Sequence, residues 1–92
     1  MGKIHVKNMI SVSGNPIANQ FEIRTNKGVY FQSYDSIIVF IDNKRQVFLD
    51  TYCWDYSNTT GKYRNQFLGE NIKETRKKIK SKEYKLKDLN NG

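Results

Sequence analysis

The chain has 92 residues, of which 37% are hydrophobic and 13% aromatic, and it carries a formal net charge of +7. These values predict one globular domain over residues 1–92 and exclude an intrinsically disordered chain. Because Cys53 is the only cysteine, an intramolecular disulfide is excluded. There is no membrane-length apolar run and no apolar core of a signal peptide, so we expect a cytoplasmic protein without a membrane partner.

The first half of the chain alternates between apolar and polar residues, as half-buried strands do. Strands separated by turns rich in Gly, Asn, Asp and Pro are expected near residues 3–9, 17–25, 29–34, 37–41 and 46–49. The run Ile37–Ile41 is apolar throughout, which is typical of a central strand covered on both faces. Residues 1–50 are therefore predicted to form an antiparallel β-meander.

The second half changes to helical periodicity. Thr59 or Thr60 is expected to N-cap a first helix that runs through Leu68 and stops at Gly69. Residues 71 and 74, Asn and Glu, have the spacing of a capping box that opens a second helix ending near residue 81.

A last alternating segment, Tyr84–Leu89, predicts an edge strand. The predicted fold class is α+β: an antiparallel sheet of about five to six strands, with two short helices from the C-terminal half packed on one face. Within the single domain, residues 1–50 form the meander, residues 51–82 an aromatic joint and basic helices, and residues 83–89 the final strand.

The positive charge is concentrated at the end of the chain. Residues 1–60 hold six Lys or Arg against five Asp or Glu, whereas residues 61–92 hold ten against four. On the second predicted helix an apolar seam of Ile72, Thr75 and Ile79 is flanked by an arc of cations, which are Lys73, Arg76, Lys77 and Lys80. The arc is either a polyanion-binding surface or a solvated helix face.

Aromatic residues precede this basic region. In an extended segment, Tyr52, Trp54 and Tyr56 would face one way, with Lys62 and Arg64 as the nearest cations. Aromatic rings beside cations are typical of proteins that bind single-stranded nucleic acid. The alternative is that these rings belong to the core, which a small domain fills with large side chains.

Little in the sequence indicates catalysis. His5 is the only histidine, so no zinc site, metal ligand set or cofactor is expected. Cys53 has no histidine near it in the sequence, and Asp50 with Asp55 fits structural roles at a strand end and a turn. No phosphate-binding glycine loop is present. We expect that the protein is not an enzyme.

The sequence has a Trp-Asp-Tyr-Ser block at 54–57, followed by Thr-Thr-Gly-Lys-Tyr-Arg-Asn-Gln-Phe-Leu at 59–68. With other segments between residue 14 and about residue 89, this block resembles a family of small phage and prophage proteins of unassigned function. Position 53 is usually aromatic in that pattern, so Cys53 departs from it. The resemblance implies an origin in a mobile element and a location in the host cell, and it supplies no catalytic residues.

Two binding hypotheses follow, and a third of another class stays open. The first is an anti-CRISPR-like inhibitor of a host protein or ribonucleoprotein complex, acting through the basic surface. The second is a direct binder of single-stranded DNA or RNA. The third is an enzyme or small-ligand binder built around residues 54–60. The two helices also have the turn length of a helix-turn-helix, but the third supporting helix of that motif is missing. The sequence does not fix the oligomeric state.

Overall fold

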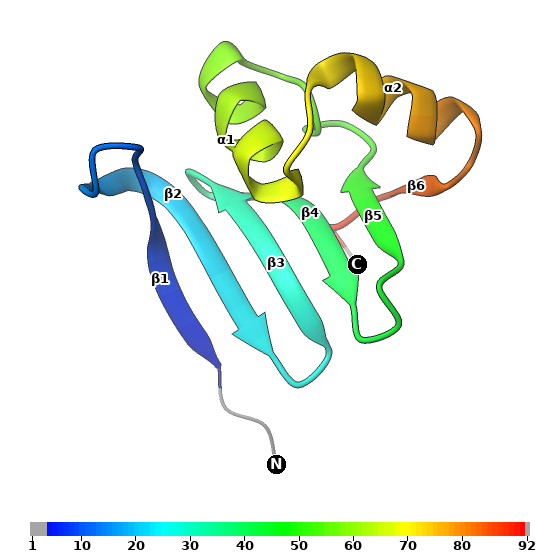
Figure 1. Ribbon diagram of the computed structural model, residues 1–92. Helices are drawn as coiled ribbons and strands as arrows, with labels where there is room; N and C mark the ends of the chain where they lie inside the picture. Colours follow the sequence, from blue (N-terminus) through cyan, green and yellow to red (C-terminus); the bar gives the residue numbers. More distant parts are fainter. Residues whose placement is uncertain (1–3, 92) are drawn as a thin grey trace.

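The computed structural model describes residues 4–91 and consists of one sheet with two helices (Figure 1). The strands lie in chain order: β1 His5–Ile10, β2 Pro16–Thr25, β3 Gly28–Ser33, β4 Ser36–Asp42, β5 Val47–Asp50 and β6 Tyr84–Lys87. The helices are α1 Asn58–Leu68 and α2 Ile72–Lys80. The predicted α+β class, with both helices in the C-terminal half and on one face of the sheet, is confirmed.

The prediction of an entirely antiparallel sheet is wrong at its last strand. β1 to β5 pair antiparallel, but β6 runs parallel to β5, with Val47 opposite Tyr84 and Asp50 opposite Lys87. The two helices form the crossover that a parallel pair requires, because they return the chain to the end of the sheet where β5 began. The sheet is therefore mixed.

The first helix begins earlier than predicted. Ser57 is its N-cap, and the Ser57 hydroxyl accepts a hydrogen bond of 3.1 Å from the main-chain N–H of Thr60. Thr59 and Thr60 lie inside the helix, where the hydroxyl of Thr60 instead contacts that of Ser33 at 2.8 Å. The predicted termination at Gly69 is confirmed, since Gly69 has φ of 70° and its N–H donates to the carbonyl oxygen of Asn65.

The second helix begins as predicted. The Asn71 side chain accepts a bond from the Glu74 N–H, and the Glu74 carboxylate accepts one from the Asn71 N–H, which completes the capping box. The helices are 11 and 9 residues long, and no helix within residues 4–91 is long and apolar enough to cross a membrane.

The core lies between the helices and the face of the sheet that they cover. Phe31, Val39 and Leu49 of the three central strands are fully buried there. The ring of Phe67 from α1 stacks on Phe31 with 5.6 Å between centroids. Trp54 and Tyr63 also pack against this core, so the aromatic segment joins the helices to the sheet.

The opposite face of the sheet carries a row of aromatic rings. Tyr30, Phe40 and Phe48 lie side by side on β3, β4 and β5, with centroid distances of 4.4 Å and 6.1 Å. No helix covers this face in the described part of the chain (Figure 1). Within the described residues, helices therefore cover only one face of the strand at residues 37–41, in which Ile38 and Val39 are both fully buried.

Candidate nucleic-acid interface

The second helix is fixed to the sheet along the predicted seam. Thr75 is fully buried, and Ile72 and Ile79 are half-buried. Because the helix is capped at its start and anchored along this side, its backbone is held in place and the cations project from its other sides.

A buried carboxylate reinforces the anchor. The side chain of Glu70 is 4% exposed and accepts hydrogen bonds from Thr75 Oγ1 at 2.6 Å, Lys78 Nζ at 2.7 Å and the Tyr84 hydroxyl at 2.7 Å. Burial alone would raise the pKa of Glu70, but the hydrogen bonds outweigh it and the pKa lies below its usual value. Burial and the bond to Glu70 raise the pKa of Tyr84 to about 12. These contacts tie α2 to β6, and they occupy Lys78.

Four exposed cations project from the remaining surface of this helix, and we call them the α2 basic surface: Lys73, Arg76, Lys77 and Lys80. Their predicted exposure is confirmed. Arg76 reaches the Asp55 carboxylate at 3.5 Å, whereas the three lysines form no ion pair within residues 4–91. Three positive charges on one short helix are thus left without a protein partner in that part of the chain.

Lysines in and near the last strand carry further positive charge at this edge of the sheet. Lys82 and Lys85 line a surface hollow beside Ile79, next to the end of α2. Lys87, farther along β6, lies 5.7 Å from the centroid of the Phe48 ring. The sequence did not place these lysines near the helix, because their neighbourhood depends on β6 pairing with β5 after the crossover.

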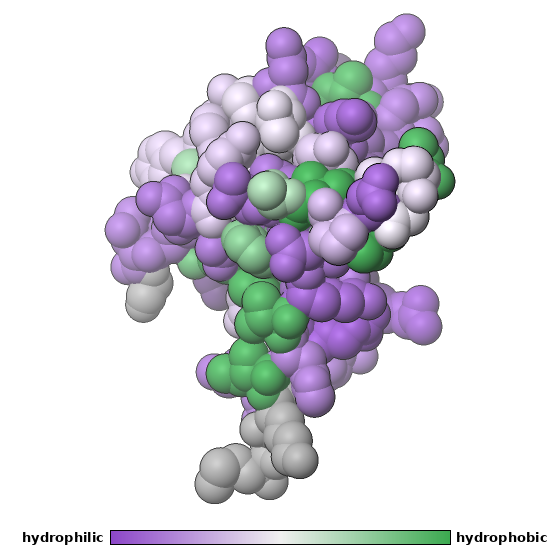
Figure 2. All heavy atoms as spheres, turned by 90° about the vertical axis from the view of Figure 1, so that its left-hand side faces the viewer, coloured by the Kyte–Doolittle hydropathy of each residue, from purple (hydrophilic) through white to green (hydrophobic). Residues whose placement is uncertain are grey.

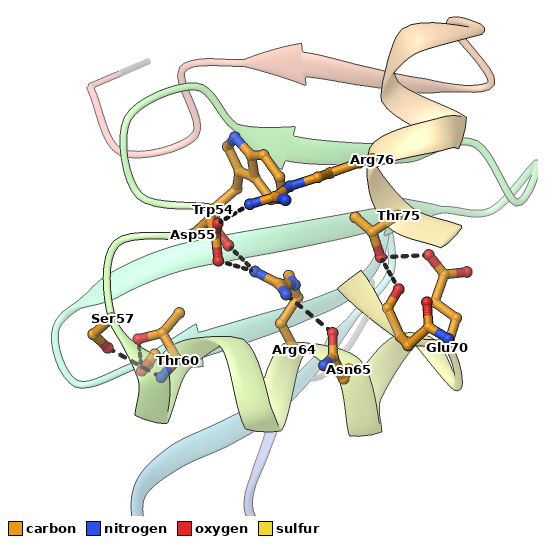
Figure 3. Close-up of polar contacts among 11 residues, drawn as sticks. Trp54, Asp55, Ser57, Thr60, Arg64, Asn65, Glu70, Thr75 and Arg76 are labelled. Atoms are coloured by element: carbon orange, nitrogen blue, oxygen red, sulfur yellow. Dashed lines mark hydrogen bonds and ion pairs between the residues drawn. The ribbon is translucent and has the colours of Figure 1, made fainter. Parts of the chain in front are cut away.

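Arg64 was predicted to contact a partner, and the structure contradicts this. Arg64 is 1% exposed, and its Nη1 donates to the Trp54 carbonyl oxygen at 2.7 Å and to Asp55 Oδ1 at 3.0 Å (Figure 3). Its Nη2 donates to Asn65 Oδ1 at 3.0 Å, and the guanidinium lies 5.3 Å from the Trp54 ring centroid. Arg64 therefore joins the 51–57 loop to α1.

Tyr52, Trp54 and Tyr56 do not all face the same way, as they would in an extended segment. Residues 51–56 form turns, so the period-two argument does not apply. Tyr52 and Tyr56 are 75% and 49% exposed, whereas Trp54 is half-buried against the core. The predicted cation Lys62 is exposed on α1 and sits 5.3 Å from the centroid of the Tyr63 ring.

Asp50, Cys53 and Asp55, the acidic and thiol groups of this region, make contacts that stabilise the local structure. Asp50 accepts hydrogen bonds from the N–H groups of Tyr52, Cys53 and Leu89, which outweigh burial and lower its pKa. Burial, together with a hydrogen bond to Asp50, raises the pKa of the Cys53 thiol. A raised thiol pKa lowers the fraction of nucleophilic thiolate. Asp55 is occupied by two arginines.

Comparison with known proteins gives one match. The model of a family of unknown function, DUF8033, matches residues 4–85. No curated protein and no solved structure matches the chain.

Proposed function

Because the chain belongs to DUF8033, a family of unknown function, we propose a role for it from the geometry of the site. The protein is a non-enzymatic binding protein of phage type, acting in the cytoplasm of the host cell. It binds single-stranded DNA or RNA directly, and the α2 basic surface contacts the phosphates. The resemblance of the 54–68 block to small phage proteins supports the phage origin.

The observation that carries this proposal is that the lysines of α2 have two different environments. Lys78 is neutralised by Glu70, whereas Lys73, Lys77 and Lys80 have no carboxylate partner in the described residues. The helix is held by its capping box and by the Glu70 contacts. Phosphate contacts from cations on such a helix release counterions, which gives affinity without base specificity.

Fluorescence anisotropy with labelled oligo-dT and oligo-U tests this function. If the four cations of the α2 basic surface each contact one phosphate, the logarithm of affinity should fall against the logarithm of salt concentration with a slope of about −2.8. Changing all four to Gln (Lys73→Gln, Arg76→Gln, Lys77→Gln, Lys80→Gln) should remove most of that slope and of the affinity.

A matched control variant loses the same number of positive charges at positions outside α2. The variant Lys7→Gln, Arg24→Gln, Lys27→Gln, Arg45→Gln removes four exposed cations outside α2. It should keep most of the salt slope, because it leaves the α2 basic surface intact. Equal losses in the two variants would mean a non-specific effect of net charge, and no binding of the unmodified protein to naked DNA or RNA at low salt would refute the proposed function.

The second candidate is an inhibitor of a host nucleic-acid-dependent complex. One observation favours it: Tyr52 and Tyr56 are exposed in the loop that leads into α1, and exposed tyrosines are enriched at protein interfaces. Affinity purification from an expressing host tests it. Capture of one defined complex that is lost in the Tyr52→Ser, Tyr56→Ser variant, without binding to naked nucleic acid, would support the inhibitor.

A further inference from the structure

One row of residues on the face of the sheet that the helices leave open is apolar from β1 to β5. Strand register places Val6, Ile23, Tyr30, Phe40 and Phe48 in one row across β1 to β5. Ile4 directly precedes β1, and Ile10 ends this strand after the register shift that follows Asn8. In Figure 2, which looks onto the β1 edge, apolar side chains form a column down the lower part of this edge.

This pattern differs from that of a solvated sheet face. An antiparallel sheet with one face in water normally alternates apolar and polar residues, so its outer positions are polar. Here Val6 of the open-face row is 60% exposed, and Ile4 and Ile10 at the two ends of β1 are 71% and 48% exposed. The apolar run 37–41 has the composition of a strand covered twice, yet within residues 4–91 no helix lies on its second face. A second layer over this face would explain both observations.

The dimensions of the molecule agree with a missing layer. Its extents are 34 × 34 × 22 Å, and the short dimension accommodates one sheet and one layer of helices. Six strands spaced by about 4.8 Å and about 18 Å long give the open face roughly 500 Å² in projection. Since accessible surface exceeds projected area, the face approaches the 800 Å² or so per partner that a stable interface buries.

We propose that this open face is the interface of a homodimer, in which two sheets pack face to face with the helices outside. Face-to-face packing of two sheets at about 10 Å is a common way to bury such surfaces. The same face on both copies satisfies a two-fold interface, which needs a surface complementary to itself. The inference does not depend on the proposed function.

The charges on this face favour a second copy of the chain as its partner, and they favour one orientation of the two copies. Two carboxylates have the parity of the face, and main-chain N–H groups occupy both: Asp42 accepts from Lys44 and Gln46, and Asp50 accepts from three others. Among residues 4–91, the remaining charges with the parity of this face are Lys85 and Lys87 on the β6 edge. A basic protein surface would therefore find no free carboxylate in the described part of this face. Two copies avoid repulsion between their lysines when β6 of one lies across β1 of the other.

Analytical ultracentrifugation of the full chain tests the dimer between about 1 μM and about 1 mM protein, a range that covers typical dimer affinities. The mass should rise with concentration from 10.8 kDa towards twice that value. The variant Ile4→Lys, Val6→Lys should remain at the monomer mass over the whole range. Both residues are exposed in the single chain, so these substitutions leave its core unchanged.

Two exposed apolar residues off this face provide the control. Val12 is fully exposed in the β1–β2 turn, and Leu86 is 45% exposed with the opposite parity on β6. The variant Val12→Lys, Leu86→Lys adds the same charge and should associate like the unmodified protein. A constant monomer mass for the unmodified protein, or equal association of the two variants, overturns the proposal. A monomer whose oligo-dT affinity drops at least tenfold only in the Ile4→Lys, Val6→Lys variant would reassign the face to nucleic acid.

Discussion

Arg64 and Asp55 form an ion pair of 3.0 Å whose two partners differ sharply in exposure. The Arg64 side chain is 1% exposed, while the Asp55 side chain is 35% exposed and also reaches Arg76 at 3.5 Å. Asp55 thus joins a buried arginine to an exposed one, and the two contacts should differ in their contribution to stability.

We predict that Arg64→Ala lowers the free energy of unfolding by about 3 kcal/mol, because it leaves the Trp54 carbonyl group without its donor and opens a cavity beside the Trp54 ring. Arg76→Ala should cost less than about 1 kcal/mol, since its partner contact is solvent-exposed. Urea denaturation followed by circular dichroism measures both. Equal costs for the two variants would contradict the assignment of Arg64 as a structural residue.

The N-cap of α1 gives a second prediction. Ser57→Ala should destabilise the protein by about 1 kcal/mol, because the N–H of Thr60 loses its acceptor. Thr59→Ala should be nearly neutral, since Thr59 is exposed in the first turn and does not cap the helix. If thermal or urea melts showed that Thr59→Ala is the more destabilising variant, Thr59 would be the N-cap, as the sequence predicted.

Local signals in the sequence predict most of the elements. Turn residues and period-two alternation locate the strands, and the capping box at Asn71 and Glu74 locates the start of α2 to the residue. The cap of α1 was misplaced because Ser, Asn and Thr occupy all of positions 57–60, and each of these residue types can cap a helix. Which one does so is decided by contacts such as the one between Thr60 and Ser33.

Long-range relationships could not be predicted from the sequence. The parallel entry of β6 depends on the path of both helices, and it determines where Lys82 and Lys85 lie. Arg64 and Lys62 are both cations of α1, but Arg64 is buried and donates a hydrogen bond to the carbonyl oxygen of Trp54, ten residues earlier. The anchoring role of Glu70 could not be predicted either, because its three hydrogen-bond partners come from α2 and β6.

Gly61 in α1 and Gly69 at the C-cap of α1 should respond oppositely to substitution by alanine. Gly61 lies within the helix, and a Cβ there would meet Arg64 and Asp55 at ordinary contact distances of 3.6–3.8 Å. Gly61→Ala should therefore stabilise the protein by about 0.5–1 kcal/mol. Gly69→Ala should destabilise it by about 1 kcal/mol, because φ of 70° is strained for alanine. Thermal melts of the two variants measure the difference, and a stabilising Gly69→Ala would contradict the left-handed helix end.

Two carboxylates predict how stability depends on pH. Burial opposes the ionised forms of Glu70 and Asp50, but hydrogen bonds outweigh it and lower the pKa of both groups in the folded state. In the unfolded chain they titrate near about 4.3 and 3.9. As the pH falls through these values, the unfolded state therefore binds more protons than the folded state. Their stabilisation is fully present above about pH 5 and is lost as the pH falls through the lowered folded values.

Urea denaturation between about pH 2.5 and pH 7 measures this dependence, because the slope of unfolding free energy against pH counts the difference in bound protons. Glu70→Gln and Asp50→Asn should each cost about 1–3 kcal/mol at pH 7 and should each flatten the acid limb of the curve. Glu83→Gln is the control, since Glu83 is exposed and forms no ion pair within residues 4–91. Its curve should follow that of the unmodified protein. If Glu70→Gln kept the full acid limb, Glu70 would not be an ionised anchor between α2 and β6.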